Sequence, residues 1–296
     1  MGGNAAEVLA KPAFRKIDWL KRDIAVERRP DGVIVMKSRI PLNPYATHIP
    51  ASLAKWAVER PDRTWLAQRA GSDRQWRKVG YAEAKRTADA LTQGILNLRL
   101  PEGRPVALLS GNSIEHALMT LAAMQARVPV APVSPAYSLM SQDHAKLKYL
   151  FGLVKPALVV VQDGPTFAKA LKALDLSGIP VVHVARPAEG IKSIAYADLA
   201  ATPVTSEVAQ SIARITPDTV GKLLFTSGST GMPKAVINTQ RMMCANAAMM
   251  MQTRPRKADG PLPTYLDWMP WNHAMGGNAL FNPLLIEGGT LYIDDA

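Results

Sequence analysis

The chain has 296 residues, of which 48% are hydrophobic, and its formal net charge is +11. A chain of this length and composition can bury a large core, so we expect about two domains. Its single cysteine, Cys244, excludes a disulfide framework and a cysteine metal site, and it fits a reducing cytoplasm. No apolar run approaches the length of a membrane span, so we expect no membrane protein.

Residues 1–45 are predicted to form an irregular segment that covers a surface built by later residues. This stretch is charged, and any long element is interrupted by Pro12, Pro30, Pro41 and Pro44. Regular patterns follow it. They predict a helix over 51–60, a hairpin of 64–68 and 75–79 around Gly71, and a helix over 81–98.

Strands and helices then alternate. Short apolar strands are predicted at 106–109, 128–133, 157–161 and 180–184, with helices over 114–126, 143–154 and 165–174. Buried strands separated by helices predict an α/β fold with mostly parallel sheets covered by helices. We expect a first α/β subdomain over 46–210 and the start of a second, incomplete one over 211–296. The second is predicted to contain strands 222–226, 265–269 and 290–293 and helices 240–251 and 274–285.

The most informative pattern begins where the predicted strand 222–226 ends. An apolar stretch stops at Thr226-Ser227-Gly228-Ser229-Thr230-Gly231-Met232-Pro233-Lys234, and a β-branched stretch then resumes. Glycines let backbone N–H groups approach an anion, hydroxyls add donors and the lysine adds a positive charge, which together fit a polyphosphate. The spacing matches neither a Walker loop, since Ala235 follows the lysine, nor a Gly-x-Ser-x-Gly nucleophile elbow. A turn that merely links two strands is the alternative interpretation.

This loop resembles the phosphate-binding signature of the adenylate-forming enzymes, the acyl- and aryl-CoA synthetases and their relatives. Two further blocks resemble the same family: 108–113 with the helix and strand that follow to 137, and 268–277 with its Pro, aromatic residue and His. The resemblance extends over residues 14–293. Segments 56–66 and 132–141 are most similar to bacterial feruloyl-CoA synthetases.

The resemblance implies the N-terminal part of the large domain of an ATP-dependent ligase. Such an enzyme converts a carboxylate, here an aromatic hydroxycinnamate such as ferulate, and ATP into an acyl-adenylate and pyrophosphate, and CoA then displaces AMP. The nucleotide phosphates are assigned by resemblance to Thr226, Ser227, Gly228, Ser229, Thr230, Gly231 and Lys234. The acyl substrate or the CoA tunnel is assigned to Trp271, Asn272, His273 and Gly276. A satisfied core histidine is the alternative for His273, and His116 and His144 are expected to be structural.

Members of that family are much longer. The resemblance places their Mg²⁺ ligand, a ribose-binding Asp and a C-terminal lysine beyond Ala296, so no certain catalytic residue and no metal ligand is assigned within the chain. We therefore expect a ligase fragment that forms no thioester in isolation. The alternative is a catalytically dead nucleotide-binding or scaffold module from a truncated gene. The reading frame after Ala296 distinguishes these hypotheses.

The charge of +11 raises a second alternative, nucleic-acid binding. The basic residues are scattered, with modest groups at 11–29 and 254–257, and no aromatic-interleaved recognition motif accompanies them. A solvated basic surface that attracts anionic nucleotides is the favoured interpretation. We expect a small carboxylate as the partner and no nucleic acid.

Overall fold

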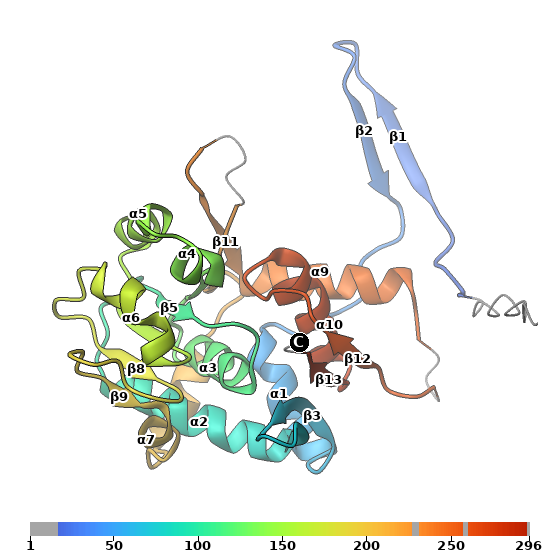
Figure 1. Cartoon of the computed structure of the whole chain (residues 1–296). Helices are drawn as coiled ribbons and strands as arrows, with labels where there is room; N and C mark the ends of the chain where they lie inside the picture. Colours follow the sequence, from blue (N-terminus) through green and yellow to red (C-terminus); the bar gives the residue numbers. More distant parts are fainter. Residues whose placement is uncertain (1–16, 227–230, 257–259, 295–296) are drawn as a thin grey trace, which may run out of the picture.

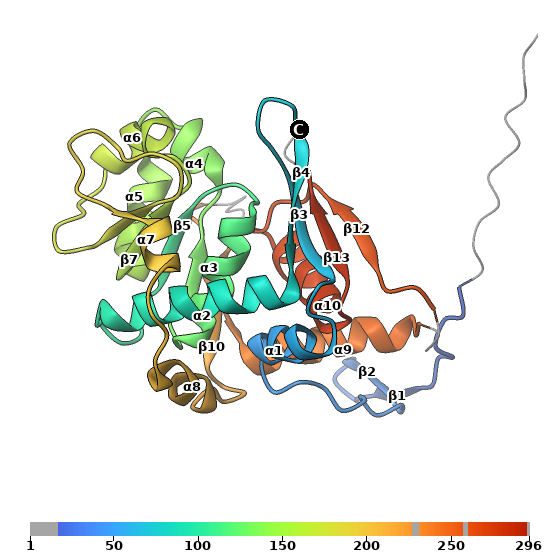
Figure 2. The ribbon, with the colours of Figure 1, turned by 90° about the horizontal axis from the view of Figure 1, so that it is seen from below.

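The computed structural model describes residues 17–226, 231–256 and 260–294. Two regions, each built on its own sheet, lie side by side in Figures 1 and 2. Both combine mostly parallel strands with helices, which confirms the predicted α/β class. Within the described ranges, no helix is both long and apolar enough to cross a membrane.

The larger sheet has seven strands in the order β11–β10–β6–β5–β7–β8–β9. All neighbours in it are parallel except β10 and β11. Its strands are β5 Val106–Leu109, β6 Val130–Pro132, β7 Leu158–Val161, β8 Val181–His183, β9 Ile194–Ala195, β10 Val220–Phe225 and β11 Ala235–Thr239.

Helices cover both faces of this sheet. Successive β5 residues point to opposite sides and therefore belong to two different cores. Val106 and Leu108 belong to the core that contains α2 and α3, whereas Ala107 and Leu109 belong to the core that contains α5 and α6. The helices of this region are α2 Tyr81–Asn97, α3 Ile114–Gln125, α4 Pro135–Leu139, α5 Ala145–Val154, α6 Gly164–Lys172, α7 Tyr196–Ala200 and α8 Ser206–Ala213. Every β5 side chain is buried, and burial on both faces explains why such strands appear in the sequence as nearly continuous apolar stretches.

The smaller sheet has the order β12–β13–β3–β4. Its strands are β3 Thr64–Ala70, β4 Gln75–Gly80, β12 Thr264–Asp267 and β13 Thr290–Ile293. The hairpin predicted around Gly71 is confirmed, since β3 and β4 pair antiparallel and Gly71 has a φ of 72°. β13 is parallel to both β12 and β3, so the early hairpin joins the last strands of the chain.

Sheet membership differs from the sequence-based expectation. The strand predicted to open a second sheet near Lys222 is β10, and it pairs with β6 in the larger sheet. Conversely, the early β3–β4 hairpin pairs with β13 rather than with the strands that follow it. Local periodicity identifies strands but does not encode their long-range partners. The division predicted at residue 210 therefore does not coincide with the boundary between the sheets.

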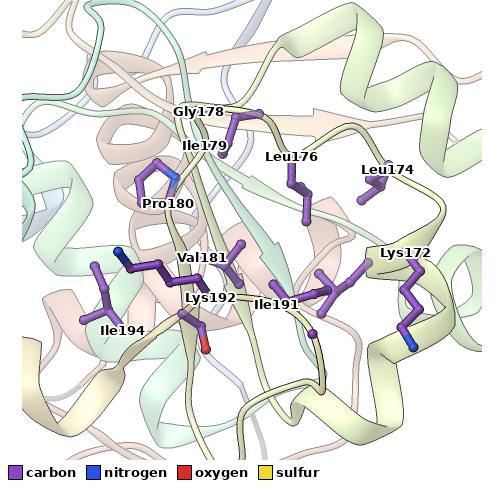
Figure 3. A pocket seen from close by; sticks show the side chains of 13 residues that line it. Lys172, Leu174, Leu176, Gly178, Ile179, Pro180, Val181, Ile191, Lys192 and Ile194 are labelled. Atoms are coloured by element: carbon purple, nitrogen blue, oxygen red, sulfur yellow. The ribbon is translucent and has the colours of Figure 1, made fainter.

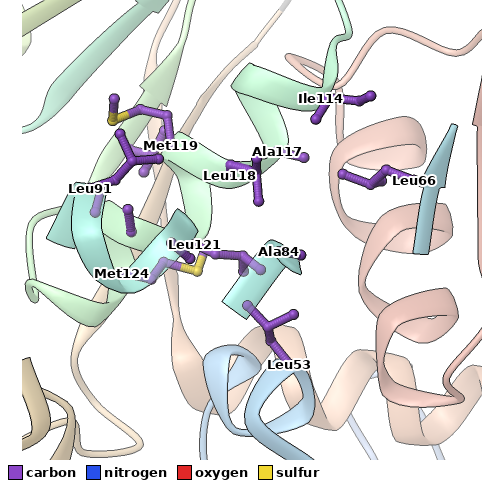
Figure 4. Packing of buried hydrophobic residues seen from close by; sticks show 14 of the residues in the cluster. Leu53, Leu66, Ala84, Leu91, Ile114, Ala117, Leu118, Met119, Leu121 and Met124 are labelled. Atoms are coloured by element: carbon purple, nitrogen blue, oxygen red, sulfur yellow. The ribbon is translucent and has the colours of Figure 1, made fainter. Parts of the chain in front are cut away.

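One continuous apolar core fills the space between the two sheets. In Figure 4, Leu53, Leu66, Leu91 and Leu121 converge there from α1 Ile49–Glu59, β3, α2 and α3. Phe281 of α10, which spans Phe281–Ile286, packs edge-on against the ring of Trp65. The long helix α9, Gln240–Thr253, contributes Met243 and Cys244, and the cysteine is buried.

The N-terminal segment forms a hairpin, so its predicted irregular character is wrong over residues 24–38. β1 Ile24–Arg28 pairs antiparallel with β2 Ile34–Ser38. Pro30 does not prevent this, because it lies in the turn beside Gly32, whose φ is 84°. The hairpin projects from the body in Figure 1, and the chain flanking it contacts the end of α9.

Candidate functional site

The parallel strands β5, β6, β7 and β10 bring their carboxyl ends to one edge of the larger sheet. This edge is where ligands bind in open α/β sheets. Two of the three blocks singled out in the sequence reach this edge: block 108–113 leaves β5 at Ser110, and the predicted phosphate loop leaves β10 at Thr226. The edge is therefore the candidate site.

The predicted phosphate loop lies between two strands, as expected, and these strands, β10 and β11, pair antiparallel. Its base is closed by two hydrogen bonds of 3.0 Å: Thr226 N donates to the carbonyl of Lys234, and Lys234 N donates to Thr226 Oγ1. Gly231 and Lys234 are exposed. Ser227, Gly228, Ser229 and Thr230, also assigned to the phosphates, lie outside the described residues.

The block after β5 turns sharply into α3. Ser113 caps that helix by accepting a hydrogen bond of 3.0 Å from His116 N. The ring of His116 is buried, with Nδ1 2.8 Å from Ser110 Oγ and 3.1 Å from the carbonyl oxygen of Gly111. Burial first, and the nearby charge of Lys222 second, lower the pKa of His116 to about 3. This neutral, enclosed histidine agrees with the structural role expected for it.

Asn112 joins this block to the third one. Its Nδ2 donates to the carbonyl of Met269 at 2.8 Å, and its Oδ1 accepts from Trp271 N at 2.9 Å. The indole of Trp271 is buried, packs edge-on against His116 and donates to Asp267 Oδ2 at 2.9 Å. Trp271 thus anchors the segment that precedes His273.

The segment after Trp271 needs its glycines. A Cβ on Gly276 would lie 2.5 Å from the carbonyl oxygen of Met269, and one on Gly277 would lie 2.2 Å from that of Trp271. The chain therefore folds back closely on itself and continues as a π-helix, η1 Met275–Leu280. His273 is exposed at the start of this turn and Asn272 is half-buried. The predicted single helix over 274–285 is thus divided into η1 and α10.

Sequence reasoning missed Lys222, which lies in the middle of β10. Its amine is buried, donates to the carbonyl of Gly277 at 2.5 Å and lies 3.4 Å from Asn278 Oδ1. Asn278 in turn donates to Asn238 Oδ1 at 3.0 Å. Burial lowers the pKa of Lys222 to about 7. The signal available was a lone lysine inside an apolar strand.

A cavity of about 600 Å³ lies elsewhere in the described residues. Figure 3 shows it lined by aliphatic side chains such as Leu174, Ile179 and Ile191, with Lys172 and Lys192 at its margins. These residues precede β8 and β9 or end α6, which places the cavity at the amino edge of the sheet. None of the predicted site residues lines it.

The described ranges contain no cluster of side chains that could form a metal site. Over residues 17–226, 231–256 and 260–294, no group of three His, Cys, Asp or Glu side chains could hold a metal ion.

The sequence model described as "AMP-binding enzyme" matches residues 53–296. A sulfoacetate–CoA ligase of Cupriavidus necator is 26% identical over 243 residues, which is 81% of this chain and 44% of that protein. A 4-coumarate–CoA ligase of Oryza sativa is 26% identical over 219 residues, which is 73% of this chain and 38% of that protein.

Solved structures show the same fold. A fatty acyl-adenylate ligase from L. pneumophila, in complex with acyl adenylate and pyrophosphate, matches with a TM-score of 0.63 and 17% identity, covering 84% of this chain and 40% of that one. The chain thus spans about two fifths of the length of the relatives it matches.

Proposed function

The chain belongs to the AMP-binding enzyme family, and from that premise we propose that it carries the nucleotide and acyl site of an ATP-dependent carboxylate–CoA ligase. The observation that carries the proposal is the convergence of the three blocks. Asn112 links the second block to the third, and Lys222 links the strand of the phosphate loop to the third as well. A loop suited to phosphates and a segment suited to a substrate therefore share one edge of the sheet.

The first reaction joins a carboxylate oxygen to the α-phosphorus of ATP and breaks the bond to pyrophosphate. Negative charge grows on the β- and γ-phosphates as pyrophosphate leaves, and oriented donors stabilise it. Thr226 and Gly231, the intervening Ser227 to Thr230 and the exposed Lys234 are proposed for this task. In the second reaction the CoA thiol attacks the acyl carbon, and AMP leaves as the thioester forms.

An aromatic carboxylate such as ferulate is our proposal for the substrate. Two apolar side chains in the same block of sequence as His273 are exposed, Trp268 at 72% and Met275 at 53%. Exposed aromatic and thioether groups beside a candidate substrate segment fit the face of an aromatic ring. The similarity to a 4-coumarate–CoA ligase supports the same class, whereas the sulfoacetate–CoA ligase represents a small anionic alternative.

Carboxylate-dependent exchange of pyrophosphate into ATP tests this function. The assay uses the protein encoded by the complete reading frame that contains these 296 residues, with Mg²⁺ and a panel of ferulate, 4-coumarate, benzoate, palmitate and sulfoacetate. We expect the highest kcat/KM with ferulate or 4-coumarate and CoA-dependent release of AMP. Exchange only with palmitate or sulfoacetate would overturn the aromatic assignment. No exchange with any carboxylate would overturn the ligase assignment.

Substitution of Trp268 tests the substrate class, and substitution of Trp76 is its matched control. Trp268→Ala removes the exposed ring in the same block of sequence as His273, whereas Trp76→Ala removes a ring that packs against Tyr292 in the smaller sheet. We expect Trp268→Ala to raise the KM for ferulate and leave the KM for ATP unchanged. An equal rise for Trp76→Ala would show that the effect is not local to the substrate segment.

A further inference from the structure

Lys222 is a buried amine with no carboxylate partner among the described residues. Its exposure is 3%, and the described residues place no carboxylate within ion-pair distance of its amine. Its neighbours are the carbonyl of Gly277, the amide oxygen of Asn278 and, at 5.3 Å, the ring of Phe281. A polar group in such surroundings costs stability unless its hydrogen bonds are made.

An apolar side chain would fill this position in a sheet at lower cost. The contacts of the amine therefore indicate what it contributes. It donates to the backbone of η1, and π-helical turns are rare and are frequently found at functional sites. The bond fixes a carbonyl in the segment that begins at the exposed His273 and passes through Gly277.

A second contact ties the same segment to the other strand of the loop. Asn278 donates to Asn238, which lies in β11, while Lys222 lies in β10. Thr226 follows β10 and Lys234 precedes β11. Both strands that carry the predicted phosphate loop are thus bonded to two adjacent residues of η1.

We propose that Lys222, together with Asn278 and Asn238, positions the substrate segment relative to the phosphate loop. The proposal rests on the ligase function proposed above. Adenylation requires a carboxylate oxygen to lie in line with the α-phosphorus, and a misplacement of about 1 Å can cost on the order of 100-fold in rate. Lys222 is in this account a positioning residue, because it reaches both segments through backbone and amide groups rather than through the reacting atoms.

Lys222→Met tests the proposal, since methionine keeps the length and packing of the side chain and removes the donor. In the enzyme encoded by the complete reading frame, we expect kcat for pyrophosphate exchange to fall about 10- to 100-fold, with the KM for ATP unchanged. Asn278→Ala should shift kcat in the same direction by a smaller factor. Unchanged kcat in both variants would overturn the proposal.

Leu224→Ala is the matched control, because Leu224 is buried in the same strand, two residues further on, and makes no contact in this network. It should lower stability and leave kcat per folded molecule unchanged. A loss of kcat equal to that of Lys222→Met would mean that any weakening of β10 suffices, and the positioning role would be refuted.

Hydrogen exchange separates this proposal from the proposed function. In the 296-residue chain, Lys222→Met should speed exchange at the amides of η1 and β11 relative to the rest of the larger sheet, and Leu224→Ala should not. If the wild-type enzyme adenylates no carboxylate, the ligase assignment fails, while this result still decides whether Lys222 fixes the segment. Wild-type exchange rates in Lys222→Met would contradict the proposal directly.

Discussion

Two regions of the larger sheet, one at the carboxyl ends of β5 and β10 and one around β7 and β8, are built from different kinds of contact. Around the carboxyl ends of β5 and β10, buried polar side chains such as Ser110, His116 and Lys222 bond to one another and to backbone carbonyls. Around β7 and β8, buried aliphatic and aromatic side chains such as Leu150 and Phe167 form the core, and the Asp163–Arg186 ion pair lies at the surface.

The difference between these regions concerns how buried side chains affect stability. Apolar packing stabilises a sheet without needing partners, whereas each buried polar group needs a matching one. A region that keeps many such groups is less stable than an apolar one of the same size, so polarity concentrated at one edge indicates function there. The cavity at the amino edge, with its mainly aliphatic lining, lacks this feature.

The largest expected effect concerns stability in the apolar region. Leu150→Ala, at a fully buried position in α5, should lower the free energy of unfolding by about 2–5 kcal/mol, because it removes contacts and leaves a cavity. Urea denaturation measures this. Pyrophosphate exchange per folded molecule should stay unchanged, and a reduced rate would show that the two regions are not separate in function.

The next effect concerns chemistry in the polar region. Lys234→Ala should slow adenylation by about 2–4 kcal/mol of transition-state stabilisation, as expected for removing one preorganised donor. Thioester formation from a preformed adenylate should change less, because the β- and γ-phosphates are present only in the first step. The two half-reactions are measured separately, and equal slowing of both would mean that Lys234 only maintains the shape of the loop.

A smaller effect is pH-dependent. The pKa of His116 falls from 6.5 to about 3 on folding, so below pH 6.5 the unfolded chain takes up a proton that the folded protein does not. His116 thus lowers the stability as the pH decreases from 6.5 toward 3. Between pH 6.5 and 5 the loss should be about 1.5 kcal/mol.

Urea denaturation at several pH values checks this slope. The variant His116→Gln keeps a hydrogen-bonding side chain that does not titrate, so its stability should lack that contribution. An identical pH dependence in both proteins would show that His116 is not held neutral.

The smallest effect is expected at the surface of the apolar region. Arg186→Ala removes the partner of Asp163, but the arginine side chain is 67% exposed, so the loss should be below about 1 kcal/mol. Thermal denaturation measures it. A loss larger than that of Leu150→Ala would reverse the contrast between packing and surface charge.

Much of this arrangement could be predicted from the sequence. Strand and helix positions in 106–184 followed from apolar periodicity, and the placement of 226–234 between two strands followed from its Gly, Ser and Thr residues. The adjacency of the second and third blocks was not predicted. The residue that makes it, Asn112, had no local signal, because it acts across 157 residues of sequence through Met269.

The features that escaped prediction depend on long-range partners or on local detail. The pairing of β3 with β13 places Leu66 opposite Leu291, and neither strand alone encodes that distant partner. The β1–β2 hairpin differs from the expectation because a proline excludes a long element only where it falls inside one, and Pro30 occupies a turn. Lys222 was read only as part of a strand, since its polar partners lie in η1.

The central claim is that the phosphate loop and the segment around His273 form one site. A crystal structure with ferulate and α,β-methylene ATP, which cannot release pyrophosphate, tests it most directly. We expect the β- and γ-phosphates against Gly231 and Lys234 and the ferulate ring against Trp268 and Met275, with the carboxylate toward the α-phosphate. A nucleotide bound away from the carboxyl edge of the sheet, or ferulate bound in the cavity at its amino edge, would contradict the account.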